Sequence, residues 1–276
     1  MRPQPDLSIV IPAFNEEARL GATLDAYLRY CRDTGRRVEV IVVDDGSLDR
    51  TCSVVNSFAA DHPEVRLIRL AENQGKGHAV RSGVVNAQGK LILFADADAA
   101  TPLAEIESLE AAVRAGADMA IGSRALGDER VKVKARLYRR IIGRVFHRLV
   151  ELLAVHGVKD TQCGFKLFRG TVAHELFSRM RIRGFSFDVE VLMMAQRRGY
   201  RIAEVPVNWT HQPGSKVNLV TDSARMLRDL FLIRQRHLSG EYRNPHMAPW
   251  PGPESDVTSS SDPAEPGDVA LSTPRS

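Results

Sequence analysis

Val38-Glu-Val-Ile-Val-Val-Asp-Asp-Gly-Ser47 is the stretch that decides the fold class of this chain. Its apolar, β-branched first part predicts a strand over residues 38–43 that is buried on both faces. The Asp-Asp-Gly-Ser that follows supplies turn residues and a candidate N-cap for the next helix. A buried strand followed by a turn and a helix is the repeating unit of a parallel α/β sheet.

The same alternation of short apolar runs and amphipathic segments is repeated on both sides of this stretch. Leu7–Ile11 predicts a first strand, which Pro12 ends. Further strands are predicted over 65–70, 91–94 and 119–122, and helices around 20–28 and over 76–86. Successive units of this kind predict an α/β fold with a mostly parallel sheet flanked by helices.

Polar residues follow three of the predicted strands. They are Asp44, Asp45, Asp96, Asp98 and Arg124. Ligands of open α/β sheets bind beyond the carboxyl ends of the strands, which share one edge. We therefore expect these five side chains to converge on one cleft, although they are far apart in the sequence.

Asp96-Ala-Asp98 is the sharpest chemical signal in the chain. In an extended strand, residues two apart project to the same side, so both carboxylates can reach one hard cation. Mg²⁺ or Mn²⁺ held in this way keeps waters and bridges substrate phosphates. The pattern predicts a metal site at the ligand edge of the sheet, with a solvated turn as the alternative.

Gly75-Lys76-Gly77-His78 begins a predicted helix and only partly resembles a phosphate loop. It lacks both the P-loop spacing and the dinucleotide-binding fingerprint. Lys76 is nevertheless placed to neutralise a phosphate at the helix N-terminus.

Composition narrows the class of protein. The 276 residues are 43% hydrophobic and 26% charged, which supplies a core and excludes a chain that is disordered throughout. The three cysteines have neither the spacing of a zinc site nor that of a disulfide framework, so a reducing compartment is expected.

Residues 244–276 hold five acids and one base and are rich in Pro and Ser. They predict a disordered tail after a folded domain over 1–243.

Two basic amphipathic helices are predicted toward the C-terminus, over 136–153 and over 225–238. Their arginines indicate a polyanionic partner, namely nucleic acid, anionic lipid or a phosphorylated substrate, or else a solvated helix face. Each helix either packs on the sheet or lies in a membrane interface. No apolar run reaches the roughly 18 residues that span a bilayer, and no signal peptide is recognised, so any membrane contact is expected to be peripheral.

Four motifs in order along the chain resemble those of the family 2 glycosyltransferases. They are Leu7-Ser-Ile-Val-Ile-Pro-Ala-Phe-Asn-Glu-Glu17, Val42-Val-Asp-Asp-Gly-Ser47, Asn73-Gln-Gly-Lys-Gly77 and Asp96-Ala-Asp98. Later motifs resemble the branch that transfers glucose to dolichyl or polyprenyl phosphate. They are Gly122-Ser-Arg124, Asp160-Thr-Gln-Cys-Gly-Phe-Lys-Leu-Phe168, Phe187-Asp-Val-Glu190, Val205-Pro-Val-Asn-Trp-Thr210 and Gly214-Ser-Lys216. The resemblance implies the GT-A fold, a Rossmann-like nucleotide-diphospho-sugar transferase fold, and makes 1–243 the catalytic domain.

The resemblance also implies roles for individual residues. The nucleotide of the donor, UDP-glucose, would be held by Pro12, Ala13, Asn15, Glu16, Asp44, Asp45, Lys76 and Asp96. Asp96 and Asp98 would bind Mg²⁺ or Mn²⁺, and the lipid phosphate would be received by Ser123, Arg124, Arg139 and Arg140. Asp98, Arg124 and Arg139 would be the catalytic residues. Asp188 and Glu190 either support the site, contact the sugar or have a purely structural role.

The chemistry of such a transfer fits these residue types. A divalent cation with Lys or Arg stabilises the charge that develops on a diphosphate leaving group. A phosphate monoester, with a second pKa of about 6, is already largely dianionic at pH 7, so the acceptor needs no strong general base. In-line attack then inverts the sugar, from an α-linked donor to a β-linked lipid phosphate sugar.

The leading hypothesis is thus an inverting glycosyltransferase that works peripherally at the cytoplasmic face of a membrane. The runner-up transfers mannose or N-acetylglucosamine, or uses a soluble phosphorylated acceptor or a growing glycan. A non-catalytic sugar-nucleotide or membrane-binding module is a third possibility, which the intact Asp96 and Asp98 oppose. Binding of nucleic acid would explain the basic charge but not the acidic cleft, so no nucleic-acid partner is expected.

Overall fold

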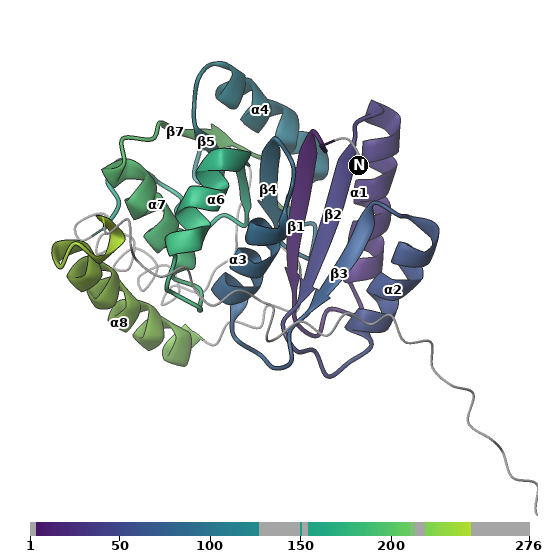
Figure 1. Cartoon of the computed structure of the whole chain (residues 1–276), viewed down its shortest axis with the longest axis horizontal. Coiled ribbons are helices and arrows are strands. Elements are labelled where there is room, and N and C mark those ends of the chain that lie inside the picture. The colour runs from purple at the N-terminus through teal and green to yellow at the C-terminus, as the bar shows by residue number, and fades with distance from the viewer. Residues whose placement is uncertain (1–3, 127–149, 151–153, 211, 213–218, 244–276) are drawn as a thin grey trace, which may run out of the picture.

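Seven strands form a single sheet at the centre of the molecule (Figure 1). The structure is a computed structural model, and it describes residues 4–126, 150, 154–210, 212 and 219–243. The strands are β1 (Leu7–Ala13), β2 (Val38–Asp44), β3 (Val65–Arg69), β4 (Leu91–Ala95), β5 (Met119–Ser123), β6 (Phe165–Arg169) and β7 (Ile202–Pro206). Their order across the sheet is β3-β2-β1-β4-β6-β5-β7.

All strands run parallel except β6, which pairs antiparallel with both β4 and β5. The predicted α/β class and mostly parallel sheet are therefore confirmed. Because β6 runs the other way, its first residue, Phe165, lies opposite Ala95 at the end of β4. The loop that precedes β6 consequently reaches the same edge of the sheet as the carboxyl ends of the parallel strands.

Helices cover both faces of the sheet (Figure 1). They are α1 (Leu20–Thr34), α2 (Thr51–Asp61), α3 (Lys76–Asn86), α4 (Ile106–Arg114), α6 (Gly170–Arg179), α7 (Phe187–Arg197) and α8 (Leu219–Leu238), with the 3-10 turns η1 (Leu103–Glu105) and η2 (Glu241–Arg243). One apolar core joins α1, α2 and α4 to the sheet, and the other joins α3, α6, α7 and α8 to its opposite face.

The alternation of residues in β1 supplies both cores at once. Leu7, Ile9 and Ile11 belong to one core, whereas Val10 belongs to the other, and all four are fully buried. A strand buried on both faces is apolar almost throughout, and in β1 the buried hydroxyl of Ser8 donates to Glu39 Oε1 at 2.5 Å. The strand does not end at Pro12 as predicted but continues to Ala13. Pairing of β1 with β4 stops at Val10, so the missing N–H of Pro12 interrupts no ladder on that side.

The second half of the domain departs further from the sequence prediction. Strands β6 and β7 and helices α4, α6 and α7 had not been predicted, whereas the basic helix predicted over 225–238 is present and begins earlier, at Leu219. Of the basic helix predicted over 136–153, only Val150 lies within the described residues. The predicted tail, 244–276, lies outside them. Within the described part of the chain, no helix combines the length and the apolarity needed to cross a membrane.

Candidate active site

A cavity of about 810 Å³ opens at the edge of the sheet where β1, β2 and β4 end. We call one side of it the strand wall, because its residues end these strands, follow them or begin α3. The strand wall comprises Pro12, Ala13, Phe14, Glu16, Arg19, Asp45, Lys76, Asp96 and Asp98. We call the other side the helix wall, formed by the α6–α7 loop and by α8. The helix wall comprises Arg181, Ile182, Arg183, Phe185, Arg225, Met226, Arg228, Asp229, Leu232 and Arg236.

Asp45 anchors one end of the strand wall. Its carboxylate accepts the backbone N–H groups of Gln74 and Gly75 at 2.8 and 2.9 Å, and only 3% of the residue is exposed. Burial raises the pKa of Asp45 to about 6. Gly75 has a φ of 100°, and a Cβ there would lie 2.7 Å from the carbonyl oxygen of Arg183. The start of α3 is thus held against the helix wall by a backbone contact that only glycine permits.

Asn15 and Asp44 lie behind the cavity, where they shape its wall. Asn15 has a left-handed φ of 52°, and its side-chain oxygen accepts the N–H of Leu48 at 2.8 Å. The Asp44 carboxylate is fully buried and accepts the N–H of Ser47 at 3.2 Å. Of the residues for which nucleotide contact was predicted, these two do not line the cavity. The Asn15 side chain joins the turns after β1 and β2, and the Asp44 carboxylate is engaged within the turn after β2.

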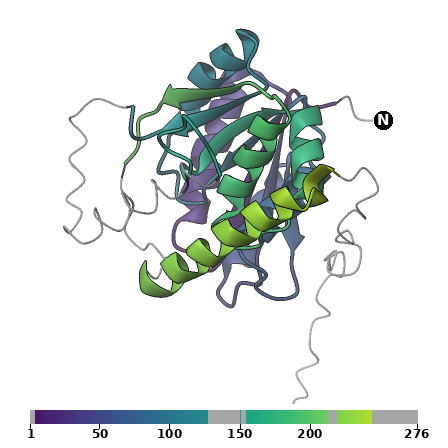
Figure 2. The same ribbon diagram turned by 90° about the vertical axis from the view of Figure 1, so that its left-hand side faces the viewer.

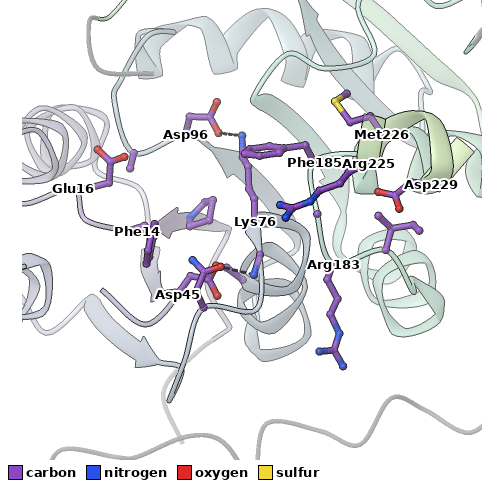
Figure 3. A pocket seen from close by; sticks show the side chains of 18 of the residues that line it. Phe14, Glu16, Asp45, Lys76, Asp96, Arg183, Phe185, Arg225, Met226 and Asp229 are labelled. Atoms are coloured by element: carbon purple, nitrogen blue, oxygen red, sulfur yellow. Dashed lines mark hydrogen bonds and ion pairs between the residues drawn. The ribbon is translucent and has the colours of Figure 1, made fainter. Parts of the chain in front are cut away.

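Asp96 and Lys76 meet at the centre of the strand wall (Figure 3). The Lys76 Nζ lies 2.7 Å from Asp96 Oδ1. Burial lowers the pKa of Lys76, but the carboxylates of Asp96 and Asp188 outweigh it and raise that pKa overall. Lys76 is therefore a cation held beside the Asp-x-Asp motif, in the position of a group that neutralises a phosphate.

Both carboxylates of the Asp-x-Asp motif line the cavity, and the side chains of Asp96 and Asp98 are 34% and 26% exposed. The motif lies in the turn after β4 rather than within the strand. Asp98 Oδ1 accepts the N–H of Ala100 at 3.0 Å, and the intervening Ala99 has a φ of 48°. This strained turn is of the kind that persists at functional sites, where the surrounding structure holds it in place.

The donor set of this turn fits a hard divalent cation. No group of three or more His, Cys, Asp or Glu suited to a metal is found among the described residues, so the protein offers two carboxylates. Mg²⁺ is commonly held by one or two carboxylates with substrate phosphates and waters completing its shell. Asp96 and Asp98 match that requirement, because both open into a cavity large enough for a phosphate-bearing ligand.

Gly164 sets the position of Asp96. The Asp96 N–H donates to the carbonyl of Gly164 at 3.0 Å. A Cβ on residue 164 would lie only 1.9 Å from Asp96 Oδ2. Any side chain at this position would push the carboxylate away, so the loop before β6 determines where Asp96 points. The sequence gives no sign of this contact, which depends on the antiparallel course of β6.

A buried ion pair lies beneath the strand wall. Lys166, only 1% exposed, has its Nζ 2.7 Å from Asp188 Oδ1 and donates to the carbonyl of Cys163 at 2.6 Å. Burial raises the pKa of Asp188. The Nζ atoms of Lys76 and Lys166 lie 5.3 and 5.8 Å from the centre of the Phe94 ring. Asp188 thus supports the site from within the core and does not line the cavity.

Arg124 lies beside the cavity, fixed by two neighbours. Its Nε and Nη2 donate to the two carboxylate oxygens of Asp160 at 2.8 and 2.9 Å. Its guanidinium lies 5.5 Å from the ring of Trp209, a cavity residue. Burial lowers the pKa of Arg124, but its hydrogen bonds to Asp160 raise it overall. Ser123 is fully buried, and Arg139 and Arg140 lie outside the described residues.

Glu190 holds the loop part of the helix wall. Its carboxylate, fully buried, accepts the N–H groups of Arg181 and Ile182 at 2.9 and 2.7 Å. The hydroxyl of Tyr242 donates to Glu190 at 2.6 Å, which connects the loop to the chain beyond α8. Burial raises the pKa of Glu190. The sequence left open whether Glu190 supports the site, contacts the sugar or has a purely structural role. In the structure it holds the loop of the helix wall and does not line the cavity.

Helix α8 completes the helix wall. Figure 3 shows Arg225 and Asp229 coming from α8 on the far side of Lys76 from Phe14 and Glu16. Among the described residues that line the cavity, five of those on the helix wall are arginines, whereas the strand wall holds four carboxylates. A cavity with an acidic wall, suited to a cation, and a basic wall facing it is suited to a ligand with several phosphate charges. Sequence periodicity identified α8 but did not show that it borders the cavity.

Comparison with known proteins agrees with this geometry. The family model described as "Glycosyl transferase family 2" matches residues 8–177. A dolichyl-phosphate beta-glucosyltransferase of Drosophila melanogaster is 41% identical over 254 residues, covering 87% of this chain and 78% of the relative. The human protein of the same name is 40% identical over 254 residues, with coverage of 87% and 78%.

Solved structures show a similar fold. Glucosyl-3-phosphoglycerate synthase from Mycobacterium tuberculosis, in complex with Mn²⁺, UDP and glucosyl-3-phosphoglycerate, is 20% identical and has a TM-score of 0.64. The alignment covers 84% of this chain and 80% of that one. The same enzyme in complex with Mg²⁺ and UDP has a TM-score of 0.61 at 20% identity, with coverage of 84% and 80%. The predicted GT-A fold is confirmed by these similarities.

Proposed function

The chain belongs to glycosyl transferase family 2, in its dolichyl-phosphate beta-glucosyltransferase branch, and on that premise we propose how its cavity works. The chain is a glycosyltransferase that moves glucose from UDP-glucose to a polyprenyl phosphate with inversion, giving a β-linked lipid phosphate sugar. The observation that carries this proposal is the placement of Lys76, Asp96 and Asp98 at the centre of a cavity whose two walls have opposite charge.

The strand wall is proposed to bind the donor. Pro12, Ala13, Glu16 and Asp45 line the end of the cavity nearest β1 and β2, where uracil and ribose would lie. An ionised Asp45 would accept hydrogen bonds from the nucleoside. Asn15 and Asp44 would act indirectly, by holding the turns that form this end. Lys76, 2.7 Å from Asp96, would donate to the diphosphate.

Asp96 and Asp98 would hold a divalent cation, Mg²⁺ or Mn²⁺, together with the diphosphate of the donor. When bound, the cation stabilises the negative charge that develops on the departing UDP. Lys76 adds a fixed positive charge to the same leaving group. Gly164 keeps the Asp96 carboxylate aimed at this point, and the buried pair of Lys166 and Asp188 supports it from below.

The acceptor phosphate is proposed to bind on the Arg124 side of the cavity. Asp160 accepts hydrogen bonds from Nε and Nη2 of Arg124, and the remaining guanidinium N–H groups are proposed to bind the acceptor phosphate. Arg139 and Arg140 are proposed to join Arg124 there, with Ser123 contributing to the backbone of the site. Arginine is suited to this task because its planar fork binds phosphate oxygens in a defined direction. That direction would place one phosphate oxygen opposite the diphosphate for in-line attack.

The bond changes need no protein base. An oxygen of the phosphate monoester attacks the anomeric carbon, the bond from that carbon to the UDP oxygen breaks, and UDP leaves with the electron pair. The acceptor is largely dianionic at pH 7, since its second pKa is about 6. Because the acceptor is a membrane lipid, we expect the chain to work as a peripheral protein at the cytoplasmic face of a membrane.

A transfer assay tests the proposal. The purified chain is incubated with Mg²⁺, polyprenyl phosphate in detergent micelles and UDP-glucose labelled in the sugar. GDP-mannose and UDP-N-acetylglucosamine are the comparison donors, and 3-phosphoglycerate is the comparison acceptor. Label that enters the organic phase from UDP-glucose alone supports the proposal. Label that remains in a water-soluble phosphorylated product contradicts the assigned acceptor.

Charge reversal at Arg139 tests the acceptor site separately. Arg139→Glu should raise the KM for polyprenyl phosphate far more than the Kd for UDP-glucose. Equal losses in both would contradict the placement of Arg139 at the lipid phosphate.

A further inference from the structure

Helix α8 has an exposed apolar face in addition to the face that borders the cavity. Among the described residues, four large hydrophobic side chains are exposed, and three of them belong to α8. These are Leu227, Phe231 and Leu238, which are 37%, 63% and 71% exposed. Their spacings of four and seven residues place them on the same side of the helix. We call this side the outer face of α8.

The opposite side of α8 is part of the core, so the exposure of the outer face is not a sign of a loosely attached helix. Leu230 and Ile233 are fully buried in the core that joins α3, α6 and α7. The chain after α8 is tied down by the hydroxyl of Tyr242, which donates to Glu190. Figure 2 shows α8 lying across the outside of the molecule. The outer face is consequently presented on a fixed platform.

The described charged side chains of α8 that flank the outer face are arginines. Arg228 and Arg234, both exposed, flank its apolar residues. Among the residues of α8 whose side chains are described, Asp229 is the one acid. It lies on another side of the helix, where it lines the cavity. An apolar stripe flanked by arginines complements an anionic lipid surface, where the apolar groups enter the acyl boundary and the arginines meet the headgroups.

We infer that the outer face of α8 docks the chain on an anionic lipid bilayer. The inference rests on the proposed function and deepens it, because the same helix lines the cavity through Arg225, Met226 and Arg228. Docking by the outer face holds the catalytic domain at the surface of the membrane in which a polyprenyl phosphate is embedded.

Vesicle co-sedimentation of the full chain tests this inference. Vesicles of phosphatidylcholine are compared with vesicles that also contain phosphatidylglycerol. The wild type should bind the anionic vesicles, and added salt should weaken the binding because it screens Arg228 and Arg234. Phe231→Asp should lower the vesicle partition coefficient at least about tenfold, since it places a charge where an apolar ring enters the interface.

Two further variants make the result specific. Leu238→Asp changes the same face at its other end and should lower the partition coefficient in the same direction. Leu48→Asp is the matched control, because Leu48 is 93% exposed but lies on the turn before α2. It should bind vesicles as the wild type does. Equal binding by wild type, Phe231→Asp and Leu238→Asp would overturn the inference, as would a wild-type dimer that Phe231→Asp converts to a monomer.

Activity measured in two settings separates this inference from the proposed function. With acceptor in detergent micelles, Phe231→Asp should transfer glucose at the wild-type rate. With the same acceptor in anionic vesicles, its rate should fall together with its binding. A wild type that transfers no glucose in micelles contradicts the proposed function, whereas a Phe231→Asp variant that is fully active on vesicles contradicts the docking face alone.

Discussion

The strand wall and the helix wall face the same cavity, but they are held in place in different ways. Residues of the strand wall follow strands whose side chains are buried on both faces of the sheet, so their backbone has little freedom. The helix wall consists of a loop held by the Glu190 carboxylate and a helix at the surface. We propose that the rigid wall binds the donor and the cation, and that the arginines of the more exposed wall help Arg124 to attract the anionic acceptor. Changes in the two walls should therefore affect different kinetic constants.

The largest effect is expected from removing a carboxylate of the strand wall. Asp98→Asn should lower kcat about a thousandfold, because cation stabilisation of the leaving group contributes several kcal/mol and each 1.36 kcal/mol is about tenfold in rate. The free energy of unfolding should change little, since the ion pair of Asp98 with Arg19 is long, at 3.9 Å, and partly exposed. Initial rates and thermal unfolding measure the two effects. Asp25→Asn, which removes an exposed carboxylate of α1, is the control and should leave kcat unchanged.

A smaller but still large loss is expected when the Asp96 carboxylate is displaced rather than removed. Gly164→Ala should lower kcat about a hundredfold, because its Cβ would lie 1.9 Å from Asp96 Oδ2 and a misplacement of about 1 Å has an effect of that size. Gly21→Ala, in α1, is the matched control because its nearest contact would be an ordinary 3.7 Å. Wild-type turnover by a folded Gly164→Ala variant would show that Asp96 does not need this position.

A change in the helix wall should affect the KM for the acceptor rather than kcat. Arg225→Glu should raise the KM for the lipid acceptor about tenfold while leaving the Kd for UDP-glucose within a factor of about two, because Arg225 faces the strand wall across the cavity. Steady-state kinetics with varied acceptor and calorimetry with UDP-glucose provide the two constants. Arg32→Glu, in the last turn of α1, is the control for charge alone. If Arg225→Glu lost donor affinity to the same extent, the two walls would not divide the substrates.

The smallest expected effect comes from the titration of Asp45. Burial raises its pKa to about 6, so lowering the pH from 7 to 5.5 protonates most of a carboxylate proposed to bind the nucleoside. The Kd for UDP-glucose should rise about fourfold over this interval in the wild type. Asp45→Asn should bind more weakly than the wild type at pH 7 and show a flatter pH dependence. The same pH dependence in both proteins would assign the titration to another group.

Protonation of Asp45, which should weaken donor binding, should increase the free energy of unfolding. The pKa of Asp45 is higher in the folded chain than its ordinary value of 3.8, so the folded state binds the proton more tightly. Its contribution to the free energy of unfolding is fully present below pH 3.8 and is lost as the pH rises through about 6. Urea unfolding at pH 4.5 and pH 7 should show a larger loss over this interval in the wild type than in Asp45→Asn.

Local sequence patterns were sufficient for the first half of the fold. The five predicted strands are present, and α3 spans the predicted residues 76–86, because apolar runs and helical periodicity are properties of neighbouring residues. Strand β6 was missed because its sequence, Phe-Lys-Leu-Phe-Arg, contains a lysine at a buried position. A fully buried Lys166 is compatible with the fold only because Asp188, from α7, lies 2.7 Å away.

In the candidate site, too, the sequence identified residues at strand ends and helix starts but not the directions of their side chains. Asp45, Lys76, Asp96 and Asp98 were singled out from the sequence, because strand ends and helix starts of a parallel sheet meet at one edge. Asp44 was singled out by the same rule but lies behind the wall, because its carboxylate accepts the N–H of Ser47 in the turn. Whether a polar residue at a strand end faces the ligand or the turn depends on the direction of one side chain.

The sequence by itself determined the parallel sheet, the acidic motif after β4 and the family, since these are recorded in short runs of neighbouring residues. Only the tertiary structure decided that Gly164 positions Asp96, that Glu190 holds the loop at Arg181 and that α8 forms the basic wall. The physical reason is that each of these contacts joins residues distant in the sequence, and close approach in space leaves no periodic pattern in the chain.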